Sequence, residues 1–190
     1  MDKYKIIALF GPAGSGKDYI QKHIMKTIWG KTHFNEIISC TTRPPREREK
    51  DGIDYHFFSS PQDLIKQDLI EYTIFRDWWY GTPVSSLNIN KINIGVFNIN
   101  GINQLVNNDY ENRINCLPIY IKTNPKIRLL RQLQRETEPD CDEIIRRYLT
   151  DQKDFLNIPF HYYVIENNTD EIQPIVHDII ELTKCMDKLN

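Results

Sequence analysis

The amino-acid sequence predicts a single α/β domain in which helices flank a parallel sheet. An apolar run of strand length at residues 5–10 leads through a glycine-rich loop into a segment with helical spacing. Further along, apolar runs of strand length alternate with helical segments, and this alternation favours parallel strands joined by right-handed crossovers. The 190 residues, 40% hydrophobic and 26% charged, have an ordinary globular composition and can bury a substantial core.

The first strand, residues 5–10, runs into the G-x-x-x-x-G-K pattern of a phosphate-binding loop. Ile20, Ile24 and Ile28 then recur at helical spacing, so the loop opens a helix. Glycines let backbone N–H groups converge on an anion, and the helix N-terminus adds partial positive charge. We therefore expect the phosphates of a nucleotide to bind here. The loop residues are Gly11, Pro12, Ala13, Gly14, Ser15, Gly16 and Lys17.

A charged segment follows the second strand, which is expected at residues 34–40. Pro44 and Pro45 exclude regular strand pairing, so residues 41–59 form a loop that a short aromatic strand at 55–58 closes. The next expected elements are a helix beginning near Pro61, a strand at 69–75, an aromatic turn at 78–83 and a short polar helix around 84–90. The remaining ones are strands at 94–99, 116–121 and 162–166, helices at 124–135, 143–155 and 171–189, and a loop at 136–142.

Two spaced motifs lie in the middle of the chain. The first reads S-x-T-T-R-x-P-R-x-x-E-x-x-G-x-D-Y and consists of Ser39, Thr41, Thr42, Arg43, Pro45, Arg46, Glu49, Gly52, Asp54 and Tyr55. The second consists of Glu71, Tyr80, Gly81 and Thr82. With both spacings intact, the chain resembles the guanylate kinases over nearly its whole length. The arginines of that family's lid match Arg131, Arg135 and either Arg146 or Arg147.

The resemblance implies a P-loop NTPase-type parallel sheet flanked by helices, with a small subdomain that binds the nucleoside monophosphate (NMP) and a helical lid. The core would comprise about residues 1–32, 94–133 and 148–190, the NMP-binding region about 33–93 and the lid about 134–147. It also implies transfer of the γ-phosphoryl group of ATP to GMP or dGMP. We keep two alternatives open: a kinase for a broader set of deoxynucleoside monophosphates, and a catalytically silent binding module.

The resemblance divides the candidate site residues into three groups. Those expected to bind GMP are Ser39, Arg43, Arg46, Glu49, Tyr55, Glu71, Tyr80, Thr82 and Asn100. Those expected to bind ATP are the loop residues 11–17, Asp18 and Asn167. The expected catalytic residues are Lys17, Arg131, Arg135, Arg146 and Arg147, because phosphoryl transfer depends mainly on alignment and charge neutralisation.

The chemistry of individual side chains fits these assignments. The guanidinium groups of Arg43 and Arg46 can grip a phosphate dianion bidentately, beside the hydroxyls of Tyr55 and Tyr80. Glu71 can accept hydrogen bonds from N1–H and the 2-amino group of guanine, a donor pair that adenine lacks. Specificity for guanine is therefore expected.

The chain departs from the family pattern at two places. Asp18 stands where Ser or Thr normally supplies a hydroxyl to magnesium, and Asn98 and Asn100 replace the two aspartates of a D-I-D sequence. One interpretation is compensation, in which Asp18 becomes the oxygen ligand of Mg²⁺, directly or through water. The other is decay of metal binding. Mg²⁺, brought with ATP, is the cofactor that we expect.

The net charge, the cysteines and the hydropathy of the chain indicate where the protein works and which partners it binds. The net charge of −2 gives no signature of nucleic-acid binding, and no apolar run reaches membrane-spanning length. The four cysteines, Cys40, Cys116, Cys141 and Cys185, are scattered, which favours reduced thiols in the cytoplasm. We expect small nucleotides as partners, and a monomer or a homodimer.

Overall fold

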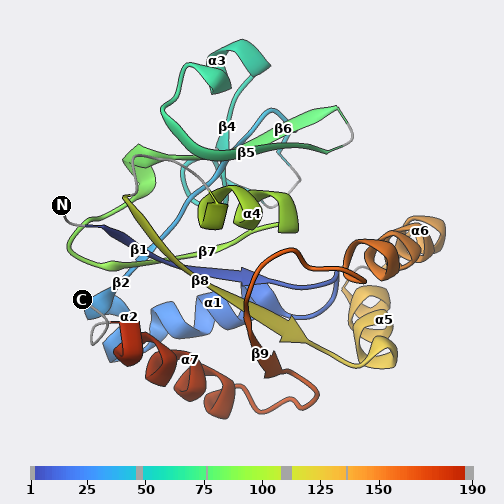
Figure 1. The fold of residues 1–190 in the computed structure, drawn as a ribbon. Helices are drawn as coiled ribbons and strands as arrows, with labels where there is room; N and C mark the ends of the chain where they lie inside the picture. The colour runs from blue at the N-terminus through green and yellow to red at the C-terminus, as the bar shows by residue number, and fades with distance from the viewer. Residues whose placement is uncertain (1–2, 46–48, 76, 108–112, 136, 187–190) are drawn as a thin grey trace.

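The computed structural model describes residues 3–45, 49–75, 77–107, 113–135 and 137–186. Its main sheet has five strands, all paired in parallel, in the order β2-β7-β1-β8-β9. The strands are β2 (Phe34–Glu36), β7 (Ile92–Val96), β1 (Tyr4–Phe10), β8 (Ile114–Lys122) and β9 (Tyr163–Glu166). This parallel sheet, with helices on both faces, confirms the predicted fold class (Figure 1).

Strand β1 is the centre of the core because its residues alternate between two buried faces. Ile7 and Leu9 pack with the buried residues of α1 (Lys17–Lys26) and α7 (Gln173–Met186). Ile6, Ala8 and Phe10 pack on the opposite side, with buried residues of α4 (Ile99–Asn107). A strand buried on both faces reads as a continuous apolar run, which is why the sequence predicted it.

A smaller sheet lies across α4 from the main one (Figure 1). Its order is β4-β3-β6-β5, formed by β3 (Cys40–Thr41), β4 (His56–Phe57), β5 (Leu69–Phe75) and β6 (Trp78–Pro83), with α3 (Pro61–Ile65) and the 3₁₀ turn η1 (Val84–Ser86) beside it. Gln104 of α4 bonds to both backbone groups of Tyr72, at 3.1 Å from the amide N and 2.7 Å from the carbonyl O. These bonds satisfy backbone groups on the edge strand β5 and fix α4 against it.

Helices α5 (Pro125–Gln134) and α6 (Cys141–Asp154) form a pair beside the carboxyl end of β1 (Figure 1). The side chains of Asn124 and Asp140 accept N–H bonds at the starts of α5 and α6 respectively, as expected of N-cap residues. Within the described ranges, no helix is both long enough and apolar enough to span a membrane.

Several expected elements are wrong in detail. The aromatic turn at 78–83 is strand β6, whose Trp79 side chain stacks on Tyr72 of β5. The strand expected at 34–40 divides into β2 and β3, which belong to different sheets. Ile28 is 87% exposed, because Thr27 ends α1 and its hydroxyl accepts from the amide of Gly30 to start α2 (Ile28–His33). The first two errors share one cause, because strand pairing with distant residues is not contained in local periodicity.

Helix α4 was not predicted. The sequence predicts one strand at 94–99, but β7 ends at Val96. The side chain of Asn98 then accepts from the amide of Gly101 at 2.7 Å, where the helix begins. Ile102 and Leu105 form its buried face. The helical spacing of these residues was a signal that could have identified it.

Candidate active site

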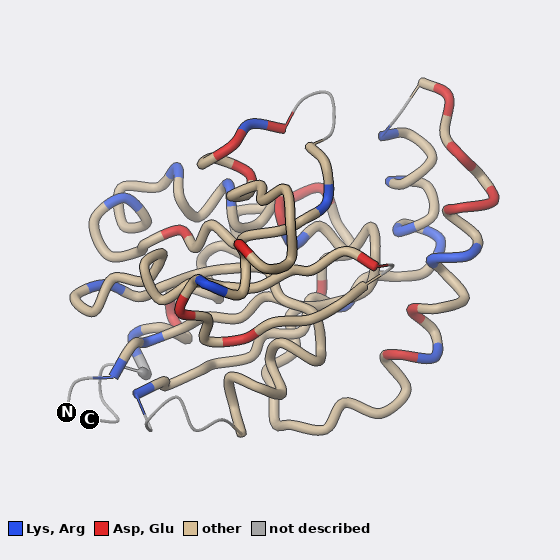
Figure 2. The backbone as a smooth tube through the Cα atoms, turned by 90° about the horizontal axis from the view of Figure 1, so that it is seen from above, with Lys and Arg blue, Asp and Glu red and all other residues tan. Residues whose placement is uncertain are grey.

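A cleft of about 610 Å³ lies among the phosphate loop, the smaller sheet and the α5–α6 pair. The predicted site residues that line it come from all three regions: Ala13, Gly14, Gly16, Lys17 and Asp18; Ser39, Arg43, Glu49, Tyr55 and Tyr80; Arg131, Arg135 and Arg147. Figure 2 shows the charges of the helix pair segregated, with basic positions recurring along α5 and acidic ones in the connection to α6 and its first turn. The fold thus brings residues from distant parts of the chain to one cavity.

The phosphate loop has the backbone conformation that its glycines permit. Gly14 and Gly16 have φ values of 77° and 91°, in the left-handed region that side-chain-bearing residues rarely adopt. The Lys17 ammonium folds across the loop and donates to the carbonyl oxygens of Gly11 at 2.7 Å and Pro12 at 3.1 Å. Burial lowers the pKa of Lys17, and the nearby carboxylates of Asp18 and Asp151 oppose that effect. The lysine is therefore held at the loop by oxygens that it can exchange for phosphate.

The back of the loop is fixed by residues that do not line the cleft. The Ser15 carbonyl oxygen accepts from Thr123 Oγ1 at 3.1 Å and from Asn167 Nδ2 at 2.8 Å. Asn167 is buried, and Arg131 Nη1 lies 3.4 Å from its carbonyl oxygen. Asn167 is one of the residues expected to bind ATP, and its side-chain amide supports the phosphate loop that forms the rest of that group.

The residues expected at the acceptor phosphate gather around Arg43. Its Nη2 donates to Glu49 Oε1 at 2.9 Å, and its guanidinium carbon lies 5.6 Å from the centre of the Tyr55 ring. The rings of Tyr55 and Tyr80 are 6.3 Å apart. Burial, together with Asp18, raises the pKa of Tyr55, so its hydroxyl stays neutral and can donate. Arg46 lies outside the described residues.

A chain of hydrogen bonds leads from the cleft wall to a buried carboxylate. Ser39 Oγ is 3.3 Å from Thr82 Oγ1, and the Thr82 hydroxyl donates to Glu71 Oε1 at 2.7 Å. Glu71 is 6% exposed, and burial raises its pKa to about 7. Gly101 leaves room for it, since a Cβ there would be 2.6 Å from Glu71 Oε2. Neither Glu71 nor Thr82 is among the residues that line the cleft, and neither is Asn100, which is exposed.

The lid arginines differ in their placement. Arg131 and Arg135 reach the cleft from the end of α5, and Arg147 reaches it from α6. Arg146 and Arg147 both donate to Glu143, from their Nε atoms at 2.8 and 2.6 Å. Of these two, Arg147 lines the cleft and Arg146 does not.

Asp18 is the residue that the sequence predicts as a ligand of magnesium. It is exposed in the first turn of α1 and lines the cleft beside Lys17. In the part of the chain that the structure describes, no group of three or more His, Cys, Asp or Glu side chains could hold a metal ion. Mg²⁺ is commonly bound by one or two carboxylates together with water and substrate phosphates, and a single aspartate suits that mode.

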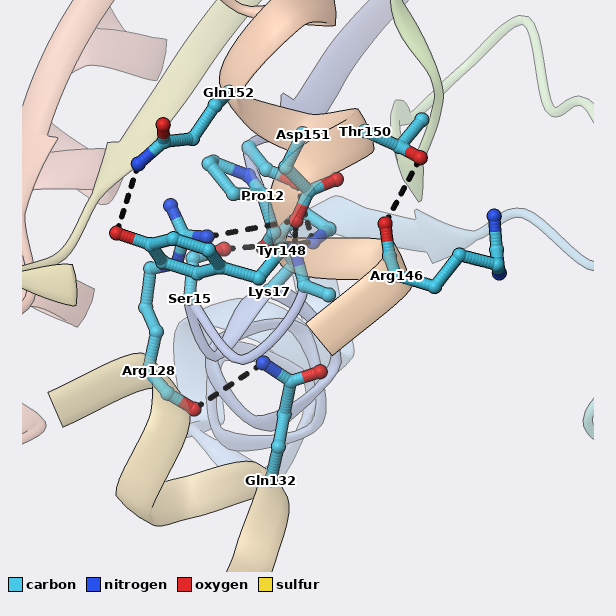
Figure 3. A network of polar contacts seen from close by, with 12 residues as sticks. Pro12, Ser15, Lys17, Arg128, Gln132, Arg146, Tyr148, Thr150, Asp151 and Gln152 are labelled. Atoms are coloured by element: carbon cyan, nitrogen blue, oxygen red, sulfur yellow. Dashed lines mark hydrogen bonds and ion pairs between the residues drawn. The ribbon is translucent and has the colours of Figure 1, made fainter. Parts of the chain in front are cut away.

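Asp151 was missed by the sequence analysis. Its carboxylate Oδ2 accepts from the backbone N–H of Ala13 at 2.7 Å, although the two residues are 138 positions apart (Figure 3). Arg128 Nη2 lies 3.6 Å from the same oxygen. The one signal in the sequence was that Asp151 follows Arg147 by four residues, which places both on one face of a helix.

The chain is similar to known proteins over most of its length. The sequence model of a family described as guanylate kinase matches residues 3–183. The guanylate kinase of Helicobacter pylori strain 26695 is 31% identical over 185 residues, which cover 93% of this chain and 86% of that protein. The guanylate kinase of Rickettsia felis is 31% identical over 191 residues and 94% of each chain. A shorter match, 39% identical over 88 residues, covers 45% of this chain and 43% of the guanylate kinase of Schizosaccharomyces pombe.

The fold is also found among solved structures. The crystal structure of guanylate kinase from Anaplasma phagocytophilum superposes with a TM-score of 0.65, covering 98% of this chain and 87% of that one. At 17% sequence identity this likeness concerns the fold alone.

Proposed function

The chain belongs to the guanylate kinase family, and we propose that it transfers the γ-phosphoryl group of ATP to GMP or dGMP, forming ADP and GDP or dGDP. The observation that carries this proposal is the single cleft that the phosphate loop, the Arg43–Tyr55–Tyr80 group and the lid arginines share. A phosphoryl donor and a monophosphate acceptor must lie in line for transfer, and a cleft walled by two phosphate-binding regions suits that arrangement.

On the acceptor side, Arg43 holds the phosphate of GMP. It is paired with Glu49 at 2.9 Å, and the phosphate dianion competes with that carboxylate for the guanidinium. The hydroxyls of Tyr55 and Tyr80 donate to the same phosphate. Glu71, oriented by Thr82, accepts from the two donors on the guanine edge, and Ser39 contacts the remaining polar edge.

On the donor side, the loop amides and Lys17 hold the phosphates of ATP. Lys17 exchanges the carbonyls of Gly11 and Pro12 for phosphate oxygens. Arg131, Arg135 and Arg147 neutralise the charge that spreads over the transferring group. Mg²⁺ that enters with ATP screens the charge of its phosphates, and Asp18 is the carboxylate available to hold it, directly or through water.

We also propose that the enzyme acts on free nucleotides in the cytoplasm, in purine nucleotide metabolism, as a monomer or a homodimer. Cys40, Cys116 and Cys141 are free thiols, as a reducing compartment requires. Burial raises the pKa values of Cys40 and Cys116 to about 12, so both stay protonated and unreactive.

A panel of acceptors tests the proposal. ADP release is followed with ATP, Mg²⁺ and, in turn, GMP, dGMP, AMP, CMP and TMP. We expect activity with GMP or dGMP to exceed that with the other three by several orders of magnitude, because a buried carboxylate is left unpaired against a base without the matching donors. Comparable kcat/KM for TMP and GMP would contradict guanine specificity. ADP release with none of the five would contradict the kinase assignment.

A further inference from the structure

A carboxylate from helix α6 holds the phosphate loop from outside the cleft. Asp151, labelled in Figure 3, accepts through Oδ2 from the Ala13 N–H at 2.7 Å. The next loop residue, Gly14, turns the backbone with a φ of 77°. Ala13 lines the cleft, but Asp151 is not among its lining residues. The carboxylate therefore reaches the loop from a side chain that is not part of the cleft lining.

The charge on Asp151 is offset by a buried arginine. The Arg128 side chain is 8% exposed and that of Asp151 17%, with 3.6 Å between Nη2 and Oδ2. The Arg128 guanidinium also lies over the Tyr148 ring, 5.3 Å from its centre. A buried ion pair adds little net stability compared with an apolar pair of similar size, because both charges lose their hydration. Stability alone therefore does not account for this pair, and its bond to the phosphate loop points to a role in the site.

The position of Asp151 on α6 links that bond to a lid arginine. Arg147 lies one helical turn before Asp151, on the same face, and lines the cleft. Its Nε donates to Glu143 at 2.6 Å, another turn back on that face. The bond between Asp151 and the loop therefore also fixes the part of α6 that carries Arg147.

We propose that Asp151 is a positioning residue for phosphoryl transfer: through the Ala13 N–H it sets the conformation of the phosphate loop, and through α6 it places Arg147 over the donor phosphates. This inference rests on the proposed function, because the loop and Arg147 matter here as the groups that bind ATP. Asp151 itself touches neither nucleotide. Its loss therefore affects ATP and leaves GMP binding unchanged.

The test compares Asp151→Ala, Asp151→Asn and the control Asp154→Asn, which removes an exposed carboxylate from the same helix. We expect Asp151→Ala to raise KM for ATP about tenfold or more, as for loss of a hydrogen bond to a charged group, and to lower kcat. KM for GMP should stay within about twofold, since Glu71 and Arg43 are untouched. Asp151→Asn should recover part of the ATP affinity, because its amide oxygen can accept from the Ala13 N–H. The control should match the parent.

Two further measurements separate the role in positioning from general destabilisation. Calorimetric titration with ADP should show the same loss of affinity in Asp151→Ala, and it requires no phosphoryl transfer. Arg147→Ala should reduce kcat less in the Asp151→Ala background than in the parent, because the arginine is already misplaced there.

An ATP KM and ADP affinity equal to the parent's, in a folded Asp151→Ala variant, would overturn the proposal. Tighter ATP binding would also overturn it, since the carboxylate would then be a competitor of the phosphates. If circular dichroism shows that Asp151→Ala is unfolded, the test rests on Asp151→Asn. A KM for ATP and a kcat equal to the parent's in that variant would overturn the proposal. A parent protein that binds ADP but phosphorylates no monophosphate would contradict the proposed function, and the ADP titrations would still test the role of Asp151.

Discussion

The Thr82 hydroxyl donates to the Glu71 carboxylate at 2.7 Å, deep beneath the wall of the cleft. That hydrogen bond favours the charged form of Glu71, but burial outweighs it and raises the pKa of this carboxyl to about 7. Glu71 therefore changes charge near neutral pH. A base that offers two N–H donors pairs best with the charged form, so the proposed role of Glu71 in reading guanine makes GMP binding depend on pH.

The first prediction concerns that dependence. Because the pKa of Glu71 is raised to about 7, its carboxylate is lost as the pH falls below 7, and KM for GMP should rise toward tenfold for each pH unit. The measurement is KM for GMP from pH 5.5 to 8.5 at saturating ATP. The phosphate of GMP itself titrates near pH 6. Glu71→Gln is the control, because its KM for GMP should change with pH only through that titration. Identical profiles for the parent and Glu71→Gln would contradict the role of Glu71.

A second prediction concerns the space beside this carboxylate. A Cβ on Gly101 would lie 2.6 Å from Glu71 Oε2, so Gly101→Ala must displace the carboxylate. We expect KM for GMP to rise while KM for ATP stays unchanged, with a loss of stability of about 1–3 kcal/mol from overpacking. Steady-state kinetics and thermal unfolding measure the two effects. An unaltered KM for GMP would show that the position of Glu71 does not control recognition of the acceptor.

The lid provides a third prediction. Arg147 lines the cleft and Arg146 does not, although both pair with Glu143. Arg147→Ala should lower kcat by about 10²–10³-fold, the usual effect of removing one group that stabilises developing charge. Arg146→Ala is the matched comparison and should cause a much smaller loss. Equal losses of kcat in the two variants would contradict a specific role of Arg147 in phosphoryl transfer.

The fourth prediction concerns Asp18 and magnesium. If Asp18 holds Mg²⁺ beside the phosphates, Asp18→Ser should raise the Mg²⁺ concentration for half-maximal activity by roughly five- to thirtyfold, or about 1–2 kcal/mol. Adding Asn98→Asp and Asn100→Asp restores the family pattern and should recover part of that loss. The assay is a magnesium titration at fixed total ATP. Superimposable titrations of Asp18→Ser and the parent would leave Asp18 as an ordinary first-turn helix residue, favoured there by the helix dipole.

The sequence was sufficient where the chemistry depends on adjacent residues. The phosphate loop follows from the strand, glycines and helix around Lys17, and the motif from Ser39 to Tyr55 has fixed spacing, so both could be located without coordinates. The parallel sheet followed from the alternation of apolar runs. The lid residue Arg147 was identified together with Arg146, because they are adjacent and one residue of slack in the spacing left both open.

What the sequence did not reveal depends on distant contacts. Asp151 and Ala13 are 138 residues apart, and no local sequence pattern predicts their hydrogen bond. Strand β6 looked like a turn because its aromatic residues only form a strand when β5 pairs with them. The hydrogen bond between the buried Asn167 amide and the Ser15 carbonyl joins residues 152 positions apart, and the fold alone creates it.

The central claim is that the phosphate loop and the smaller sheet form one active site that transfers phosphate from ATP to GMP. ADP release by the parent protein and by Lys17→Met, with and without GMP, tests it most directly. We predict rapid GMP-dependent ADP release by the parent and its near abolition in a folded Lys17→Met variant, because Lys17 supplies the positive charge at the donor phosphates. Unchanged GMP-dependent turnover in that variant would contradict the claim.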